Sequence, residues 1–166
     1  MIEEQFKVLK TLSEATGHMD LKSFAEKANL STAQALQDMQ DLAKEGYLQR
    51  VGGGYGITLK GKNALKAFTP VPEGQSFHFY FDIGQPSDFE AQSLATFYGV
   101  IKEISVESIE FHLYREDFQN WLRQACREPE LEKEFDGIRS RGLKGEELRS
   151  ELVRALDAKY GVEKLI

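Results

Sequence analysis

The sequence has little cysteine and no long apolar run, and each deficit excludes a class of protein. Cys126 is the only cysteine among 166 residues, so no disulfide can form within the chain. No apolar run approaches the roughly eighteen residues that a membrane-spanning helix needs. The N-terminal MIEEQFKVLK is charged and lacks the basic-then-apolar pattern of a secretory signal. We therefore expect a cytoplasmic protein with no membrane partner.

Basic residues are scarce in the second part of the chain. Residues 1–72 contain nine Lys or Arg and eight Asp or Glu, and residues 73–166 contain the other twelve and nineteen. The first part thus has a net charge of +1 and the second of −7, which sum to the −6 of the whole chain. An acidic surface repels phosphates, so the second part is a poor partner for nucleic acid. The first part does not have this disadvantage.

Prolines are few, and two of the four lie close together at Pro70 and Pro72, just before Gly74. This cluster cannot continue a helix or a central strand. It divides the chain into a first domain at residues 1–69, a linker at 70–75 and a second domain at 76–166.

The first domain has the periodicity of helices followed by a hairpin. Helices are predicted at residues 2–15, 21–28, 31–45 and 60–68, with Asp20 and Ser31 as N-caps of the second and third. A strand at 47–50, a turn at Gly52–Gly54 and a strand at 55–59 separate the last two helices. The stretch LSTAQALQDMQDLAKEGYLQRVGGGYGITLKGKNAL resembles winged helix-turn-helix regulators. The resemblance implies that the third helix is a recognition helix and the hairpin a wing.

The second domain has both apolar alternation and helical spacing. Strands are predicted at 77–83 and 106–114, and helices at 89–103, 116–127, 129–139 and 145–160. A strand–helix–strand order favours parallel pairing of the two strands. The fold class is therefore α+β, a winged helix-turn-helix domain followed by a small domain with a short sheet and about four helices. The segments ESIEFHLYREDFQNWLRQAC and GLKGEELRSELVRAL resemble an uncharacterised, mainly archaeal family, which implies no activity.

The third helix is the first candidate for DNA contact. Its apolar spacing leaves Thr32, Ala33, Gln34, Gln37, Asp38, Gln40, Asp41 and Lys44 facing outward. Glutamines can pair with adenine edges, and Ser31 and Thr32 can bond a phosphate at the start of the helix. The wing and the last helix add cations that can contact the DNA backbone. The complete set of predicted DNA-binding residues is Ser31, Thr32, Gln34, Gln37, Lys44, Arg50, Tyr55, Lys60, Lys62 and Lys66.

The polar faces of the two second-domain strands are the other candidate. They hold His78, Tyr80, Asp82, Glu110, His112 and Tyr114, which could converge on a metal or a substrate if the strands pair. A half-exposed sheet shows the same alternation without any site, and the histidine spacing matches no common metal motif. We therefore predict no catalytic residues, no metal and no cofactor, and we interpret Cys126 as a core residue.

Together these features predict a DNA-binding transcriptional regulator, not an enzyme, that binds double-stranded DNA through its first domain. Two strands leave open sheet edges, which either helices cover or a second copy completes, and we expect a homodimer assembled mainly through residues 76–166. The acidic second domain would thus supply assembly or effector binding. One alternative is an adaptor that uses the winged helix to dock another protein, which the few cations of the third helix favour. The third is an uncharacterised enzyme centred on His78 and His112.

Overall fold

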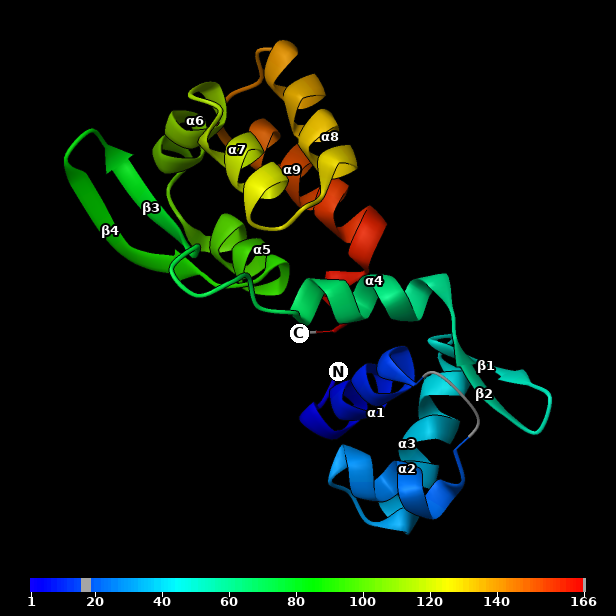
Figure 1. The fold of residues 1–166 in the computed structure, drawn as a ribbon. Helices are drawn as coiled ribbons and strands as arrows, with labels where there is room; N and C mark the ends of the chain where they lie inside the picture. Colours follow the sequence, from blue (N-terminus) through cyan, green and yellow to red (C-terminus); the bar gives the residue numbers. More distant parts are fainter. Residues whose placement is uncertain (16–18, 166) are drawn as a thin grey trace. The chain divides into compact units, whose positions relative to one another are not determined.

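A computed structural model describes residues 1–15 and 19–165, which form two compact units (Figure 1). The first unit comprises Met1–Lys66 and the C-terminal residues from Glu163 on, and the second comprises Ala67–Val162. The division lies inside a helix, before the Pro70–Pro72 segment. Residues 70–75, expected as a linker, are hydrogen-bonded to the second unit, because the Val71 N–H donates to the Gln92 carbonyl and the Trp121 indole to the Gln75 carbonyl.

The first unit contains the predicted helices and hairpin within two residues of their expected bounds. Its elements are α1 (Glu3–Glu14), α2 (Leu21–Ala28), α3 (Thr32–Lys44), β1 (Leu48–Val51), β2 (Gly54–Ile57) and α4 (Leu59–Phe68). Both predicted N-caps are present: Asp20 accepts a hydrogen bond from the Ser23 N–H at 2.8 Å, and Ser31 accepts one from the Gln34 N–H at 3.1 Å. Asn29, at φ 58°, ends α2 in the left-handed conformation.

Helix α4 packs against the base of the β1–β2 hairpin at Gly61. A Cβ atom at this position would lie 2.3 Å from the Tyr47 carbonyl oxygen and 2.7 Å from the Ile57 side chain. Only a glycine therefore permits this approach. Leu165 is also buried in the first unit, where its carbonyl accepts a hydrogen bond from the N-terminal ammonium of Met1.

The second unit is mostly helical, with one small sheet. Its elements are β3 (Phe77–Asp82), β4 (Gln85–Ala91), α5 (Leu94–Glu103), α6 (Val106–Tyr114), α7 (Asp117–Gln124), α8 (Pro129–Ser140) and α9 (Gly145–Tyr160). A short 3-10 turn at Val162–Lys164 then spans the boundary between the second unit and the C-terminal residues of the first. Over the residues that the structure describes, the chain is thus a mixed α+β protein with two two-stranded antiparallel sheets, β1–β2 and β3–β4.

The prediction of a strand at residues 106–114 is wrong, because this segment is helix α6. Ser105 caps the helix, and the buried residues Ile109, His112 and Leu113 follow the helical spacing i, i+3, i+4. The predicted parallel pairing with β3 is wrong for the same reason. The partner of β3 is β4, which begins at Gln85 after a turn in which Gly84 has φ 71°.

The predicted helix at 89–103 begins later than expected. Ser93 caps α5 by accepting a hydrogen bond from the Thr96 N–H at 3.2 Å. Ser87 and Asp88, which come just before the predicted start of this helix, lie in β4 instead. The Ser87 hydroxyl donates to the Phe79 carbonyl at 2.7 Å, so it ties the two strands together.

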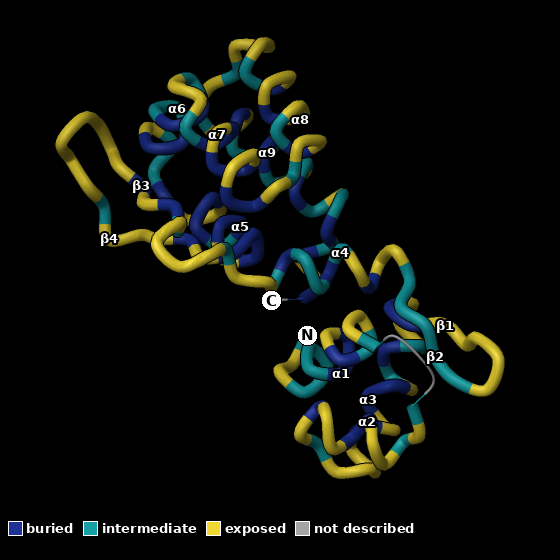
Figure 2. Tube along the Cα trace, in the orientation of Figure 1, coloured by how far each residue is buried: buried dark blue, intermediate teal, exposed yellow. Residues whose placement is uncertain are grey.

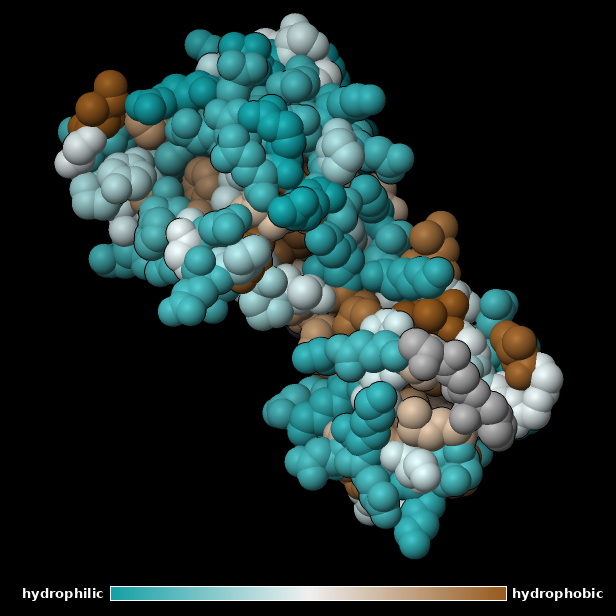
Figure 3. Space-filling view, in the orientation of Figure 1, coloured by the Kyte–Doolittle hydropathy of each residue, from teal (hydrophilic) through white to brown (hydrophobic). Residues whose placement is uncertain are grey.

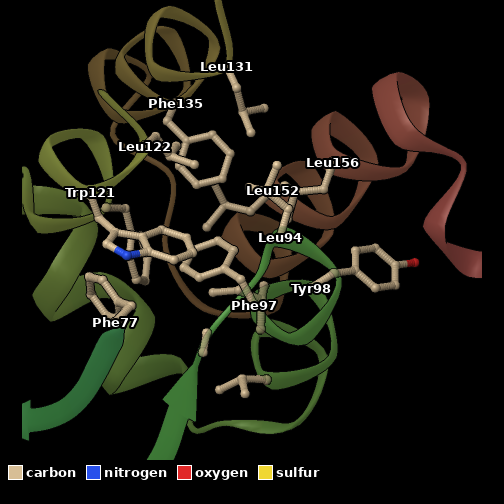
Figure 4. Packing of buried hydrophobic residues seen from close by; sticks show 14 of the residues in the cluster. Phe77, Leu94, Phe97, Tyr98, Trp121, Leu122, Leu131, Phe135, Leu152 and Leu156 are labelled. Atoms are coloured by element: carbon tan, nitrogen blue, oxygen red, sulfur yellow. The ribbon is translucent and has the colours of Figure 1, made fainter. Parts of the chain in front are cut away.

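Aromatic rings fill the centre of the second unit (Figure 4). Phe97 stacks on Trp121 with their ring centroids 5.1 Å apart, and Phe77 contacts both rings. Cys126 is buried in the same core, as predicted. Figure 2 shows that the inner faces of α5–α9 are buried, whereas the outer part of the β3–β4 hairpin is exposed. Within the described ranges, no helix combines the length and apolar character needed to cross a membrane.

Candidate functional site

Helices α2 and α3 are joined by the short turn at residues 29–31, and α3 exposes a polar face. Among the predicted DNA-binding residues, Ser31, Thr32, Gln34, Gln37 and Lys44 are all exposed. Ser31 is the cap of α3, so its hydroxyl oxygen already accepts the Gln34 N–H. Gln40 is exposed as well, and Leu36 lies between these polar residues with 40% of its surface exposed.

Two of the α3 glutamines bond to carboxylates on their own helix. The Gln34 side-chain amide donates to Asp38 Oδ1 and the Gln37 amide donates to Asp41 Oδ1, each at 3.0 Å. The prediction that Asp38 faces outward is wrong, because only 2% of its surface is exposed. Its Oδ2 has no hydrogen-bond partner among residues 1–15 and 19–165. Gln34 is therefore less available to a ligand than Gln37, whose carboxylate partner Asp41 is closer to solvent.

Arg50 and Tyr55 are brought together on the β1–β2 hairpin. They are paired across the two strands, and the Arg50 guanidinium lies 5.3 Å from the centre of the Tyr55 ring. Cation–π contact orients the guanidinium while leaving its N–H groups able to bond a phosphate. This pair is the best-defined cationic feature of the hairpin.

The three predicted lysines of α4 differ in their surroundings. Lys60 donates to the Glu45 carbonyl at 2.6 Å and lies 4.4 Å from the centre of the Tyr47 ring, so it caps the C-terminus of α3. Burial raises the pKa of the Tyr47 hydroxyl, and the charge of Glu45 adds to this shift. Lys62 is exposed and Lys66 is half-buried. Of these lysines, Lys62 is the most accessible to a DNA backbone.

His112 is fixed in one tautomer by two hydrogen bonds. The Tyr80 backbone N–H can only donate, and it lies 2.7 Å from His112 Nε2, so Nε2 is the unprotonated acceptor. Nδ1 must then bear the proton that is shared with Asp117 Oδ2 at 2.9 Å. Burial lowers the pKa of His112, and the hydrogen bond to Asp117 opposes part of this shift. Neither ring nitrogen is left to act as a base or a metal ligand.

The six polar residues expected to converge in the second domain do not all come together. Glu110 accepts a hydrogen bond from the Gly145 N–H at 2.9 Å, and the Tyr114 hydroxyl donates to the Leu143 carbonyl at 2.5 Å. His78, Tyr80 and His112 do line one pocket of about 310 Å³ beside the hairpin. In the part of the chain that the structure describes, no group of three or more His, Cys, Asp or Glu side chains is placed to hold a metal ion.

Sequence reasoning missed two residues of this pocket, Arg115 and Asp117, because it placed them after a strand. In the structure they follow α6, and the Arg115 Nε lies 3.5 Å from Asp117 Oδ2. A helix at residues 106–114 would have placed His112 and Arg115 three residues apart on one helix face, near Asp117.

Exposed apolar side chains gather at the outer ends of both hairpins (Figure 3). Ile83, between β3 and β4, has 78% of its surface exposed, and Val51, at the end of β1, has 59%.

A family model matches residues 61–157, which run from α4 into α9 and make up more than half of the chain. That model describes DUF5752, a family of unknown function. Neither a curated protein nor a solved structure matches the chain. The chain therefore belongs to the DUF5752 family.

Proposed function

We propose that this chain is a DNA-binding transcriptional regulator, in which the first unit acts as a winged helix-turn-helix domain. Helix α3 would be the recognition helix and the β1–β2 hairpin the wing. The observation that supports this proposal most is α3 itself, a capped helix that follows α2 after a short turn and exposes a polar face. Such a helix fits the width of a DNA major groove.

The residues for base contact in this proposal are Thr32, Gln37 and Gln40. Their spacing of five and three residues places them on the exposed side of α3. Glutamine side chains can form paired hydrogen bonds with adenine, and a threonine methyl can contact thymine. Gln37 must exchange its bond to Asp41 for a bond to a base, which an exposed pair permits.

Backbone contact is assigned to Arg50, Lys44 and Lys62, which are all exposed. Lys60 is not assigned to contact with the DNA backbone, because it caps the C-terminus of α3. Few cations remain, so we expect modest affinity with a strong dependence on salt. The acidic second unit would supply assembly or effector binding instead of DNA contact.

A protein-docking adaptor is the second candidate, and Leu36 is the observation that favours it. This side chain is 40% exposed on the polar side of α3, one turn before the exposed Gln40. An exposed apolar residue flanked by polar groups is typical of a protein interface. An interface of this kind would use the same face of α3 as DNA would.

The proposal is tested by selecting duplexes from a random pool with the full chain. Replacing Gln37 and Gln40 together by alanine should lower the preference for the selected duplexes over random ones by about thirtyfold or more, since each of the two paired base contacts contributes about 1–3 kcal/mol. Gln124→Ala, which changes an exposed glutamine of α7, is the matched control and should leave the preference unchanged. Failure to enrich any duplex would overturn the proposal in favour of the adaptor.

A further inference from the structure

The pocket of about 310 Å³ in the second unit has the composition of a small-ligand site. It lies between the β3–β4 hairpin and the C-terminal end of α6. Three aromatic rings line it, those of Phe77, Tyr80 and Phe111. Ligand pockets begin at about this volume and combine apolar walls with a few converging polar groups.

Arg115 is oriented in this pocket before any ligand is present. Its guanidinium carbon lies 4.6 Å from the centre of the Phe111 ring, and its Nε faces Asp117. Neither Nη nitrogen of Arg115 has a hydrogen-bond partner among the residues that the structure describes. A guanidinium held on a ring in this way keeps a planar pair of donors for an incoming acceptor.

Two acceptors of the pocket, Asp117 Oδ2 and His112 Nε2, already accept hydrogen bonds within the protein, whereas donors remain. Asp117 Oδ2 accepts the His112 Nδ1–H and faces Arg115, so its charge is offset within the protein. His112 Nε2 accepts the Tyr80 N–H. The exposed His78 ring and the Tyr80 hydroxyl can both donate, in addition to Arg115. A ligand that offers acceptors complements this arrangement better than one that offers donors.

The geometry points to a binding site for a small molecule with an oxyanion, a carboxylate or a phosphate, on a flat apolar body. The oxyanion would bond the two Nη groups of Arg115, and the apolar body would lie against the rings of Tyr80 and Phe77. His112 is a positioning residue here, because it fixes the carboxylate that orients Arg115. This inference concerns the second unit and does not depend on DNA binding by the first.

The test is an NMR titration of the full chain with sodium benzoate, phenyl phosphate and the neutral benzyl alcohol. We expect saturable shifts of the Tyr80 and Ile83 amides with at least one of the two anions, and binding of benzyl alcohol at least tenfold weaker. Comparison of benzoate with phenyl phosphate identifies which oxyanion the site prefers. The inference would be overturned if benzyl alcohol bound as tightly as both anions do. It would also be overturned if neither anion produced a saturable shift.

Variants then locate the site. Arg115→Gln should weaken the better anion by about tenfold or more, as expected when charge-assisted hydrogen bonds are removed. Arg123→Gln is the matched control, since its side chain is 51% exposed against 49% for Arg115 and is likewise ion-paired. Unchanged anion binding in Arg115→Gln, with the variant folded, would also overturn the inference.

Discussion

His112 is a polar residue buried among aromatic rings, and its two hydrogen bonds connect three segments of the second unit. Nε2 accepts the Tyr80 N–H from β3, and Nδ1–H donates to Asp117 at the start of α7. The Phe77 and Phe118 rings lie within 5.4 Å of the imidazole, measured between ring centroids. Protonation of Nε2 would place two N–H groups against each other, so the folded chain favours the neutral ring.

This geometry predicts that stability falls on mild acidification. Burial lowers the pKa of His112 in the folded chain below its ordinary value of 6.5, despite the opposing effect of the hydrogen bond that it donates to Asp117. Between these two pKa values the unfolded chain binds a proton that the folded chain does not. The contribution of His112 to the free energy of unfolding is therefore complete above about pH 6.5 and is lost as pH falls toward the folded pKa.

NMR titration of the imidazole and of the Tyr80 amide checks this prediction. Both signals should titrate together, with a midpoint below 6.5. The control is His78→Gln, which changes the exposed histidine of the same hairpin and should leave the Tyr80 midpoint unchanged. A midpoint above 6.5 would contradict the assigned tautomer.

Gly61 and Gly137 are both helical glycines, and they should respond to alanine in opposite directions. Gly61→Ala places a methyl group 2.3 Å from the Tyr47 carbonyl oxygen, so it should lower the free energy of unfolding of the first unit by about 1–3 kcal/mol. The methyl group that Gly137→Ala adds meets no atom within 4 Å, so this change should raise the free energy of unfolding of the second unit by about 0.4–1 kcal/mol. Thermal unfolding monitored by circular dichroism measures both changes. A neutral Gly61→Ala would mean that α4 does not approach the hairpin this closely.

At the scale of elements, local sequence signals were sufficient to predict the helices and strands of the first unit. The caps at Asp20 and Ser31 and the glycine turn at 52–54 each fix one boundary through contacts within a few residues. The burial of Asp38 could not be predicted, because it depends on how α3 packs on α1 and α2 and not on the spacing within α3 alone.

The segment at residues 106–114 shows why the local apolar pattern was insufficient to distinguish a strand from a helix in the second unit. Ile109, Phe111 and Leu113 alternate as in a strand, yet Ile109, His112 and Leu113 also follow helical spacing. Short apolar runs satisfy both periods, so tertiary packing decides between them. The pocket was missed for the same reason, because Arg115 and Asp117 approach His112 only when the segment is helical.

Helix α6 lies beside β3 and bonds its backbone through the Ser108 hydroxyl, so removal of this hydroxyl should loosen the hairpin. The Ser108 hydroxyl donates to the Tyr80 carbonyl at 2.6 Å, next to the Tyr80 N–H that His112 accepts. Ser108→Ala would leave that carbonyl without this donor, so amide hydrogen exchange in the β3–β4 hairpin should accelerate by about tenfold. The exposed Ser140→Ala is the control and should leave hairpin exchange unchanged. Uniform acceleration across the whole second unit would argue that Ser108 supports the core and not the hairpin alone.

For the whole molecule, we predict a homodimer formed through residues 76–166. Its expected interface is now the apolar end of the β3–β4 hairpin and not the edge of the sheet. The edge of β4 contains Pro86, Asp88 and Glu90, which oppose the addition of another strand. The exposed Phe81 and Ile83 at the end of the hairpin are the apolar alternative.

Light scattering after size-exclusion chromatography at moderate salt, with protein at tens of micromolar, measures the mass of the particle. We expect twice the chain mass for the unaltered protein and a monomer for Ile83→Asp, which places a charge in that interface. Val51→Asp, at an exposed apolar residue of the other hairpin, should remain a dimer. A monomer mass for the unaltered chain would exclude this assembly.

Binding of double-stranded DNA by the full chain, measured by fluorescence anisotropy over a series of salt concentrations, tests the central claim most directly. We expect affinity to fall steeply with salt. Arg50→Ala plus Lys62→Ala should reduce the slope of log affinity against log salt by about two, because each cation that pairs with a phosphate contributes about one to that slope. Lys133→Ala plus Lys144→Ala removes the same charge from exposed positions of the second unit and should leave the slope unchanged. No binding at low salt, or an equal reduction of the slope in the control, would contradict a DNA-binding function for the β1–β2 hairpin and α3.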